Sequence, residues 1–163
     1  MQIIDKLCSY NLPVFALKGN MYLYGKYNKF TQLLFKKYKN LNYTRVGSFK
    51  IKDNTIILFD IIFEGNNLSN KILGVNLKEE KEKFFSLFNN KNIILISHVP
   101  PFGTLDTLRN SRHVGSKILA EAIKKYQPKL VLCGHIHEAE GNAKIGKTKV
   151  YNLGSEKYKI IRF

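Results

Sequence analysis

Residues 130–138 read Leu-Val-Leu-Cys-Gly-His-Ile-His-Glu, an apolar run that leads directly into two histidines. Side chains alternate across an extended segment, so the imidazoles of His135 and His137 point to the same side. That spacing is typical of metal ligands. A third imidazole, His98, directly follows the strongly apolar run from Asn92 to Ser97. Three of the four histidines therefore fall in two short motifs. Histidines distributed at random along the chain would not cluster in this way.

The order of apolar patterns predicts an α/β fold without internal repeats or a domain linker. Stretches with the helical period predict helices, the last of them with Ser116 as its N-cap and a stop before Pro128. Continuous apolar runs predict buried strands, and the Asp53-Asn54 turn predicts a hairpin. The expected helices span 3–9, 30–38, 78–88 and 117–126. The expected strands span 13–17, 46–51, 56–63, 92–97, 130–133, 150–153 and 158–163, with a loop over 64–76.

Polar groups that can bind metal follow three of the expected strands. His98 and His135 come after buried strands, and Asn20 lies just beyond a third. In open α/β sheets, ligand sites gather beyond the carboxyl ends of the strands. We therefore expect these three groups to converge on one crevice of a layered α/β protein with mixed strands.

Several motifs in the same order resemble the metallophosphoesterase (calcineurin-like) superfamily, in its small archaeal and bacterial form. They are His-Val-Pro-Pro-Phe-Gly-Thr-Leu-Asp at 98–106, His-Val-Gly-Ser at 113–116 and Gly-His-Ile-His-Glu at 134–138, preceded by Gly19-Asn20. The similarity covers most of the chain. It implies a single domain over residues 1–163, in which two packed mixed β-sheets are flanked by helices as a four-layer sandwich that lacks its first strands.

The chain departs from the pattern of this family on its N-terminal side. Members open with strands that carry D-x-H and G-D-x-x-D motifs, and neither motif occurs here. The third motif, G-N-H-D or a variant of it, is represented by Gly19-Asn20-Met21-Tyr22. The resemblance therefore implies that half of the family's active site is present.

The resemblance also implies metal chemistry. Family members hold two divalent ions bridged by an Asp and attack a phosphate ester with a metal-activated hydroxide. By position, Asn20, His98 and His135 would bind one ion, and His137 would be the sole remaining ligand of the other. Without the bridging Asp, we expect at most one weakly held ion, drawn from Mn, Fe, Zn and Ni. No residue is assigned as catalytic.

The motif at 113–116 immediately precedes the expected helix 117–126. We expect His113 to be a loop residue. The functional alternative is that His113, Gly115 and Ser116 present the amino-terminal end of that helix to a substrate phosphate, because helix N-termini bind anions. For Asn20, the alternative is an ordinary Gly-Asn turn.

The charge and the cysteine content of the chain indicate which kinds of partner and which cellular compartment are expected. The 163 residues carry 27 basic and 12 acidic side chains, for a net charge of +15. This charge favours a phosphate-rich partner such as nucleic acid, whereas the even spread of lysines also fits an AT-rich coding bias. No apolar run approaches the ~20 residues of a membrane span, and no charged-then-apolar leader is present. Cys8 and Cys133 form no C-x-x-C pair, which favours reduced thiols in the cytoplasm.

At family level, the sequence predicts a metal-dependent phosphoesterase that hydrolyses a phosphomonoester or a phosphodiester. We favour the hypothesis that the chain is the C-terminal part of such an enzyme, with weak or absent activity by itself. The alternatives are a non-catalytic scaffold that binds phosphate or nucleic acid, and one half of a split enzyme. A sheet that lacks strands exposes an apolar edge or face, so self-association or pairing with a complementing chain is also expected.

Overall fold

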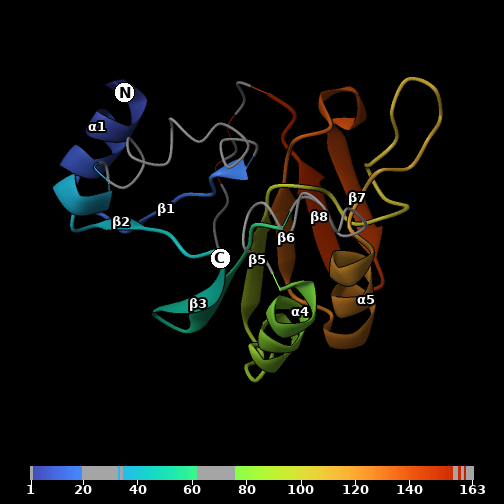
Figure 1. Ribbon diagram of the computed structural model, residues 1–163, viewed down its shortest axis with the longest axis horizontal. Coiled ribbons are helices and arrows are strands. Elements are labelled where there is room, and N and C mark those ends of the chain that lie inside the picture. The colour runs from blue at the N-terminus through green and yellow to red at the C-terminus, as the bar shows by residue number, and fades with distance from the viewer. Residues whose placement is uncertain are drawn as a thin grey trace.

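The computed structural model describes residues 2–19, 33, 35–61, 76–155, 158 and 160. Within these residues, helices and strands form a mixed α/β architecture with a six-stranded and a two-stranded sheet (Figure 1). This confirms the expected α/β fold class with two sheets and flanking helices, although the smaller sheet is parallel and not mixed as expected. The helices are α1 (Gln2–Ser9), α4 (Leu77–Ser86) and α5 (Lys117–Tyr126), with a short 3-10 helix η2 (His137–Ala139).

The larger sheet brings the ends of four parallel strands to one edge. Its order is β3-β4-β5-β6-β8-β7. Strands β4, β5, β6 and β8 run parallel, whereas β3 and β7 pair antiparallel at the two sides. The bounds are β3 (Val46–Ile51), β4 (Asn54–Phe59), β5 (Ile93–Ser97), β6 (Leu130–Cys133), β7 (Gly141–Ile145) and β8 (Thr148–Asn152).

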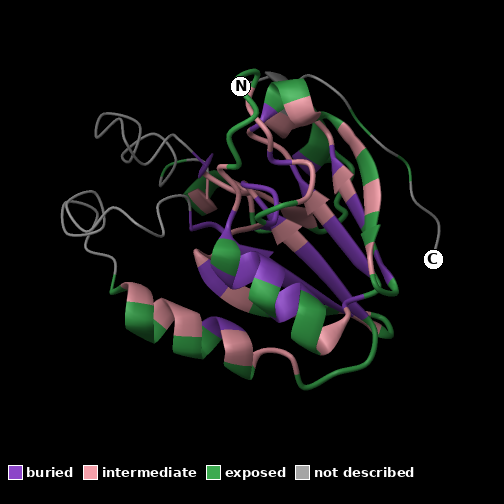
Figure 2. Ribbon diagram, turned by 90° about the vertical axis from the view of Figure 1, so that its right-hand side faces the viewer, coloured by how far each residue is buried: buried purple, intermediate pink, exposed green. Residues whose placement is uncertain are grey.

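Both faces of this sheet are covered, which explains the continuous apolar runs of its central strands. On one face, α4 and α5 pack against the strands through residues such as Phe84, Leu119 and Ile123. Figure 2 shows both helices on the same side, with buried residues along the central strands and on α5. On the other face, Phe15 and Leu17 pack against the sheet.

The smaller sheet forms an N-terminal unit with α1. Strand β1 (Val14–Phe15) runs parallel to β2 (Leu41–Asn42), and Cys8 of α1 is buried together with Leu41. The strand expected over 13–17 is therefore shorter than predicted, and its side chains are half-buried instead of buried. Cys8 and Cys133 are both buried free thiols, as expected from their apolar surroundings.

Helix α5 has the predicted bounds because its start and stop signals are strong. The Ser116 hydroxyl accepts a hydrogen bond from the Leu119 N–H at 2.9 Å, as an N-cap does. The helix ends at Gln127, which is left-handed with φ of 49°, directly before Pro128. Strands β3 and β6 have the predicted bounds, and β5 begins one residue later than predicted. The predicted hairpin forms, but β4 starts two residues before the expected strand 56–63 and ends at Phe59.

Strand β7 was not predicted, because its sequence Gly-Asn-Ala-Lys-Ile has little strand character. It forms by antiparallel pairing with β8 at the side of the sheet. The strand expected over 158–163 is absent at the two positions that the structure describes, Tyr158 and Ile160, which are highly exposed. Most of the helix expected over 30–38 and of the loop expected over 64–76 lies outside the described residues.

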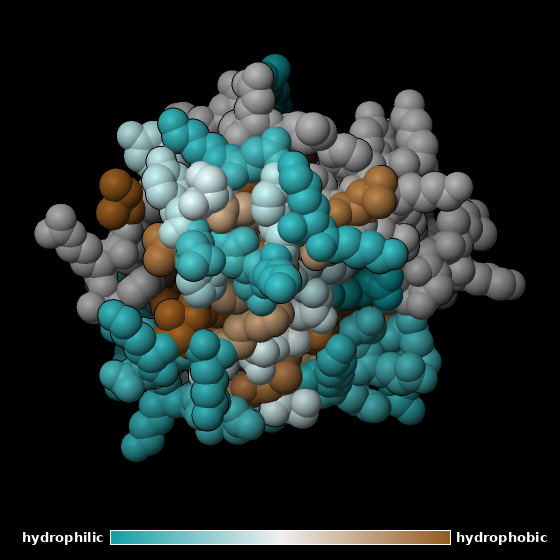
Figure 3. Space-filling model, turned by 90° about the vertical axis from the view of Figure 1, so that its left-hand side faces the viewer, coloured by the Kyte–Doolittle hydropathy of each residue, from teal (hydrophilic) through white to brown (hydrophobic). Residues whose placement is uncertain are grey.

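The described surface is mainly hydrophilic when it is viewed from the left side of Figure 1, with apolar groups separated by polar ones (Figure 3). No helix in the described part of the chain has the length and apolar character that crossing a membrane requires.

Candidate functional site

Four polar side chains lie at the carboxyl ends of the four parallel strands. Asp60 follows β4, His98 follows β5, His135 lies two residues beyond β6, and Asn152 is the last residue of β8. The sequence predicted the two histidines at this edge. It did not single out Asp60 or Asn152.

The imidazoles of His98 and His135 are in direct contact. His98 Nε2 lies 2.9 Å from His135 Nδ1, and the ring centroids are 4.6 Å apart. Two nitrogens bound to one tetrahedral ion at ~2.05 Å would be about 3.3 Å apart. The spacing therefore fits a pair of ligands that need only a small movement to share one divalent ion.

Backbone geometry at the end of β6 aims His135 at His98. His135 is a non-glycine residue in the left-handed region, with φ of 71°. The N–H of Gly134 donates to the carbonyl of His98 at 3.1 Å and ties the two strand ends together. Residues other than glycine rarely adopt this conformation, and those that do are found preferentially at functional sites.

The surroundings of these imidazoles favour the neutral form, which is the form that binds metal. Burial lowers the pKa of His98 to about 4, with smaller contributions from the positive charges of His135 and His137. Burial also lowers the pKa of His135, again with a contribution from His137. His137 lies on η2, is exposed, and is near enough to influence both rings. The extended segment predicted for His135 and His137 is therefore wrong, because the chain turns at His135 and enters a 3-10 helix at His137.

Asn20, the remaining predicted ligand, lies outside the described residues. Its neighbour Gly19 packs against the His98 ring, since a Cβ built on Gly19 would lie 2.6 Å from His98 Nδ1. Gly19 also has a φ of 53°, which favours glycine. The segment that leads to Asn20 therefore lies against the candidate metal ligand His98.

Asp60 anchors that same segment. Its side chain is 2% exposed and accepts hydrogen bonds from the backbone N–H groups of Lys18 at 2.8 Å and Gly19 at 3.2 Å. Burial raises the pKa of Asp60 to about 6, although these N–H groups and the charges of Arg45 and Lys18 act in the opposite direction. The signal that could have revealed it is a lone carboxylate inside the apolar run 56–63.

The loop between β5 and α5 is organised around a second buried carboxylate, Asp106. Asp106 accepts hydrogen bonds from the N–H groups of Gly103 at 3.0 Å and Gly115 at 2.9 Å. It also contacts His113 Nδ1 at 2.7 Å. Because an ionised carboxylate can only accept, His113 donates from Nδ1, and Nε2 lies on the far side of its ring.

These contacts distinguish the members of the predicted phosphate site. The N–H of Gly115 donates to Asp106, and the N–H of Ser116 donates to the carbonyl of Pro100 at 2.8 Å. Both backbone donors are thus used inside the protein. The side chain of His113 is 46% exposed. A phosphate at this position would therefore be contacted through the His113 ring.

The described residues contain no group of three or more His, Cys, Asp or Glu side chains arranged to hold a metal ion. What they bring together is the pair His98 and His135, with His137 nearby. Two neutral nitrogen donors suit Zn, Fe, Mn or Ni as part of a larger ligand set.

Comparison with known proteins identifies the class. A family model described as metallophosphoesterase, calcineurin superfamily, matches residues 76–160. A solved structure resembles the chain with a TM-score of 0.62 and 20% identity, covering 94% of this chain and 62% of the other, which shows the fold alone. The chain belongs to the calcineurin-like metallophosphoesterase superfamily, a superfamily of phosphoesterase-type hydrolases.

Similar curated proteins come from an archaeon and a nematode. The uncharacterized protein MJ1162 of Methanocaldococcus jannaschii is 33% identical over 129 residues, which are 76% of this chain and 52% of that protein. The UPF0046 protein T07D4.2 of Caenorhabditis elegans is 32% identical over 111 residues, which are 63% of this chain and 27% of that protein. The chain thus spans about half the length, or less, of these relatives.

Proposed function

We propose that this chain contributes the histidine side of a metal-dependent phosphoesterase centre that hydrolyses a phosphomonoester or a phosphodiester. The observation that carries this proposal is the 2.9 Å contact between His98 Nε2 and His135 Nδ1 at adjacent strand ends, in a member of this superfamily. A bound divalent ion would supply Lewis-acid chemistry to the phosphate ester.

The residues proposed to hold the ion are His98 and His135, completed by Asn20. His137 is the proposed contact to a second ion. No carboxylate joins the imidazoles within the described residues. We therefore expect the 163-residue chain to hold at most one ion weakly and to have weak or absent activity unless carboxylate ligands are supplied from elsewhere.

The proposed role of His113 is to contact a substrate phosphate through Nε2. Two observations support this role. Asp106 fixes the orientation of the ring at 2.7 Å, and the side chain is about half exposed. The loop that carries His113 lies at the same end of the six-stranded sheet as η2, which carries His137 (Figure 1). This placement is compatible with metal and phosphate contacts to the same substrate.

The metal part of the proposal is tested by calorimetric titration of the chain with Zn²⁺ and Mn²⁺. His135→Ala should weaken binding by at least about 10–100-fold, because it removes a direct ligand and even the loss of a residue that only supports a ligand has an effect of that size. His113→Ala is the matched control and should bind the ions as the unaltered chain does. Equal binding by the unaltered chain and His135→Ala would refute the assignment.

The catalytic part is tested with p-nitrophenyl phosphate and bis(p-nitrophenyl) phosphate in the presence of the same ions. Activity that appears only when a second polypeptide with D-x-H and G-D-x-x-D motifs is added, or joined to the chain, would support the missing-carboxylate hypothesis. A non-catalytic phosphate-binding scaffold is the alternative, favoured by the incomplete ligand set among the described residues. Inactivity in every combination would favour it.

Partners and location belong to the same proposal. The net charge of +15 supports binding of a phosphate-rich partner such as nucleic acid, with an affinity that falls steeply as salt is added. The outer strands β3 and β7 are the proposed surfaces for self-association or for a complementing chain. The buried free thiols of Cys8 and Cys133 fit a reducing, cytoplasmic setting.

A further inference from the structure

One buried amide connects two of the segments that carry candidate site residues, the 103–115 loop and the 134–139 turn. Asn152 ends β8 and is 1% exposed. Its Nδ2 donates to the carbonyl of Leu105 at 3.0 Å and to the carbonyl of Ile136 at 2.9 Å. Its Oδ1 accepts from the N–H of Gly154 at 3.0 Å. Both amide protons are therefore committed to backbone carbonyls that lie far apart in the sequence.

Both carbonyls belong to unfavourable stretches of backbone. Leu105 itself is left-handed, with φ of 55°, and Ile136 directly follows His135, whose φ is 71°. A bulky residue in this region is strained and persists only where its surroundings hold it in place. The Asn152 amide is a buried group positioned to hold both strained turns at once.

The two turns adjoin candidate site residues. Ile136 lies between the candidate ligands His135 and His137. The Leu105 turn immediately precedes Asp106, which orients His113. Any shift of one turn relative to the other would therefore move the candidate metal ligands relative to the candidate phosphate contact.

We propose that Asn152 is a positioning residue that holds the 134–139 turn and the 103–115 loop in one fixed relative arrangement. The consequence for metal and phosphate binding rests on the proposed function. The positioning itself is a property of the metal-free protein and can be measured there.

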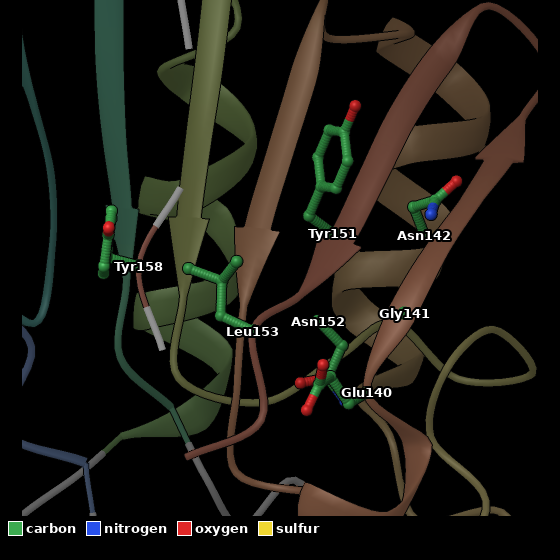
Figure 4. Close-up of a pocket in the computed structure, with 7 residues that line it drawn as sticks. All are labelled: Glu140, Gly141, Asn142, Tyr151, Asn152, Leu153 and Tyr158. Atoms are coloured by element: carbon green, nitrogen blue, oxygen red, sulfur yellow. The ribbon is translucent and has the colours of Figure 1, made fainter. Parts of the chain in front are cut away.

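Two substitutions remove the donors in different ways. Asn152→Asp keeps the shape but turns a carboxylate toward two carbonyl oxygens, which repels both. Asn152→Ser removes the amide and leaves a smaller polar group. Asn152 lines a hollow of about 220 Å³ together with Glu140, Tyr151 and Leu153 (Figure 4), and the serine variant places no charge beside the two carbonyls. Asn152→Ser therefore decides the test if Asn152→Asp does not fold.

Thr148 provides the matched control. It lies on the same strand β8, is 0% exposed, and its hydroxyl has no hydrogen-bond partner among the described residues. Thr148→Val should therefore leave both turns as they are, although it alters an equally buried polar residue at the opposite end of the strand.

The experiment is two-dimensional NMR of backbone amides and histidine side chains in the metal-free chain, followed by titration with Co²⁺, whose visible absorption reports ligand geometry. The Asn152 variants should shift resonances of both 103–115 and 134–139, including the His135 ring, and weaken Co²⁺ binding 10–100-fold. Thr148→Val should change neither. Undisturbed resonances in either segment of the Asn152 variants, or equal shifts in Thr148→Val, would overturn the proposal.

The two proposals fail separately. If the unaltered chain binds no Co²⁺, the metal-binding part of the proposed function is wrong. The NMR comparison in the metal-free state still decides whether Asn152 positions the two segments.

Discussion

Two pairs of side chains at the same end of the sheet each contain a histidine, but the surroundings of the two histidines differ. His98 is partly buried and contacts another imidazole, His135, whereas His113 is about half exposed and contacts a buried carboxylate, Asp106. Burial and neighbouring positive charge favour neutral rings in the first pair, as a metal ligand requires. In the second pair, the carboxylate holds the ring in one orientation. The neighbours of the two histidines thus give the same type of side chain two different environments, which match the two roles proposed for them.

The largest expected effect concerns the second pair. Asp106→Ala should lower the free energy of unfolding by about 3 kcal/mol, because it removes a fully buried carboxylate that accepts hydrogen bonds from Gly103, Gly115 and His113. Urea denaturation measures this change. Asp53→Ala, at an exposed turn, is the control and should change stability by less than about 0.5 kcal/mol. Equal stability of the two variants would show that Asp106 does not organise the loop.

The next prediction concerns how stability depends on pH, because burial shifts the pKa values of His98 in the first pair and of Asp60 near it. The pKa of Asp60 is raised from 3.8 to about 6, so the folded state binds more protons between these values and stability falls by about 3 kcal/mol as pH rises. The pKa of His98 is lowered from 6.5 to about 4, so stability rises with pH over nearly the same window. The two contributions oppose each other in the unaltered chain.

Two variants separate these contributions. Relative to the unaltered chain, Asp60→Asn should become more stable as pH rises from 4 to 6, and His98→Gln should become less stable. Urea midpoints at half-unit pH steps give both slopes. Slopes identical to that of the unaltered chain would contradict the opposed shifts.

A smaller effect is expected at the contact between Gly19 and the first pair. Gly19→Ala places a Cβ 2.6 Å from the His98 ring at a backbone φ of 53°, so it should cost about 2 kcal/mol of stability and displace the ring. Denaturation and Zn²⁺ titration should both respond. Gly103→Ala is the control for the backbone effect, because its φ is also positive, at 79°, but its Cβ would meet nothing within 4 Å. If both variants bind Zn²⁺ equally well, contact with Gly19 does not position His98.

The smallest stability effect is expected at His113 itself. His113→Ala should change stability by less than about 1 kcal/mol, since its side chain is about half exposed. It should nevertheless weaken phosphate binding, measured by ³¹P NMR titration, about 10-fold. Unchanged phosphate binding would contradict the proposed phosphate contact and would leave His113 with a structural role only.

Much of the C-terminal half was predictable because its signals are local. The apolar runs of β5 and β6 and the Ser116 cap of α5 act within a few residues of the chain, so their bounds were predicted closely. Strand β7 was missed because it depends on pairing with β8 and not on its own composition. The contact between His98 and His135 was anticipated from their positions after buried strands.

Roles that depend on distant partners were not predictable. Asp60 belonged to an apolar run in the sequence, and it holds Lys18 and Gly19 only because the segment after β1 lies against the end of β4 in the folded protein. Asn152 lies outside the sequence motifs that predicted the site residues. Its two acceptors lie 47 and 16 residues away along the chain.

By itself, the sequence determined the α/β class, the superfamily resemblance and the histidines placed at strand ends, because periodicity and motif spacing are properties of the chain. Only the tertiary structure decided which side chains those histidines contact, which carboxylates are buried, and which amide joins the two turns. These properties depend on burial and on hydrogen bonds between segments far apart in sequence, and neither exists until the sheet has formed.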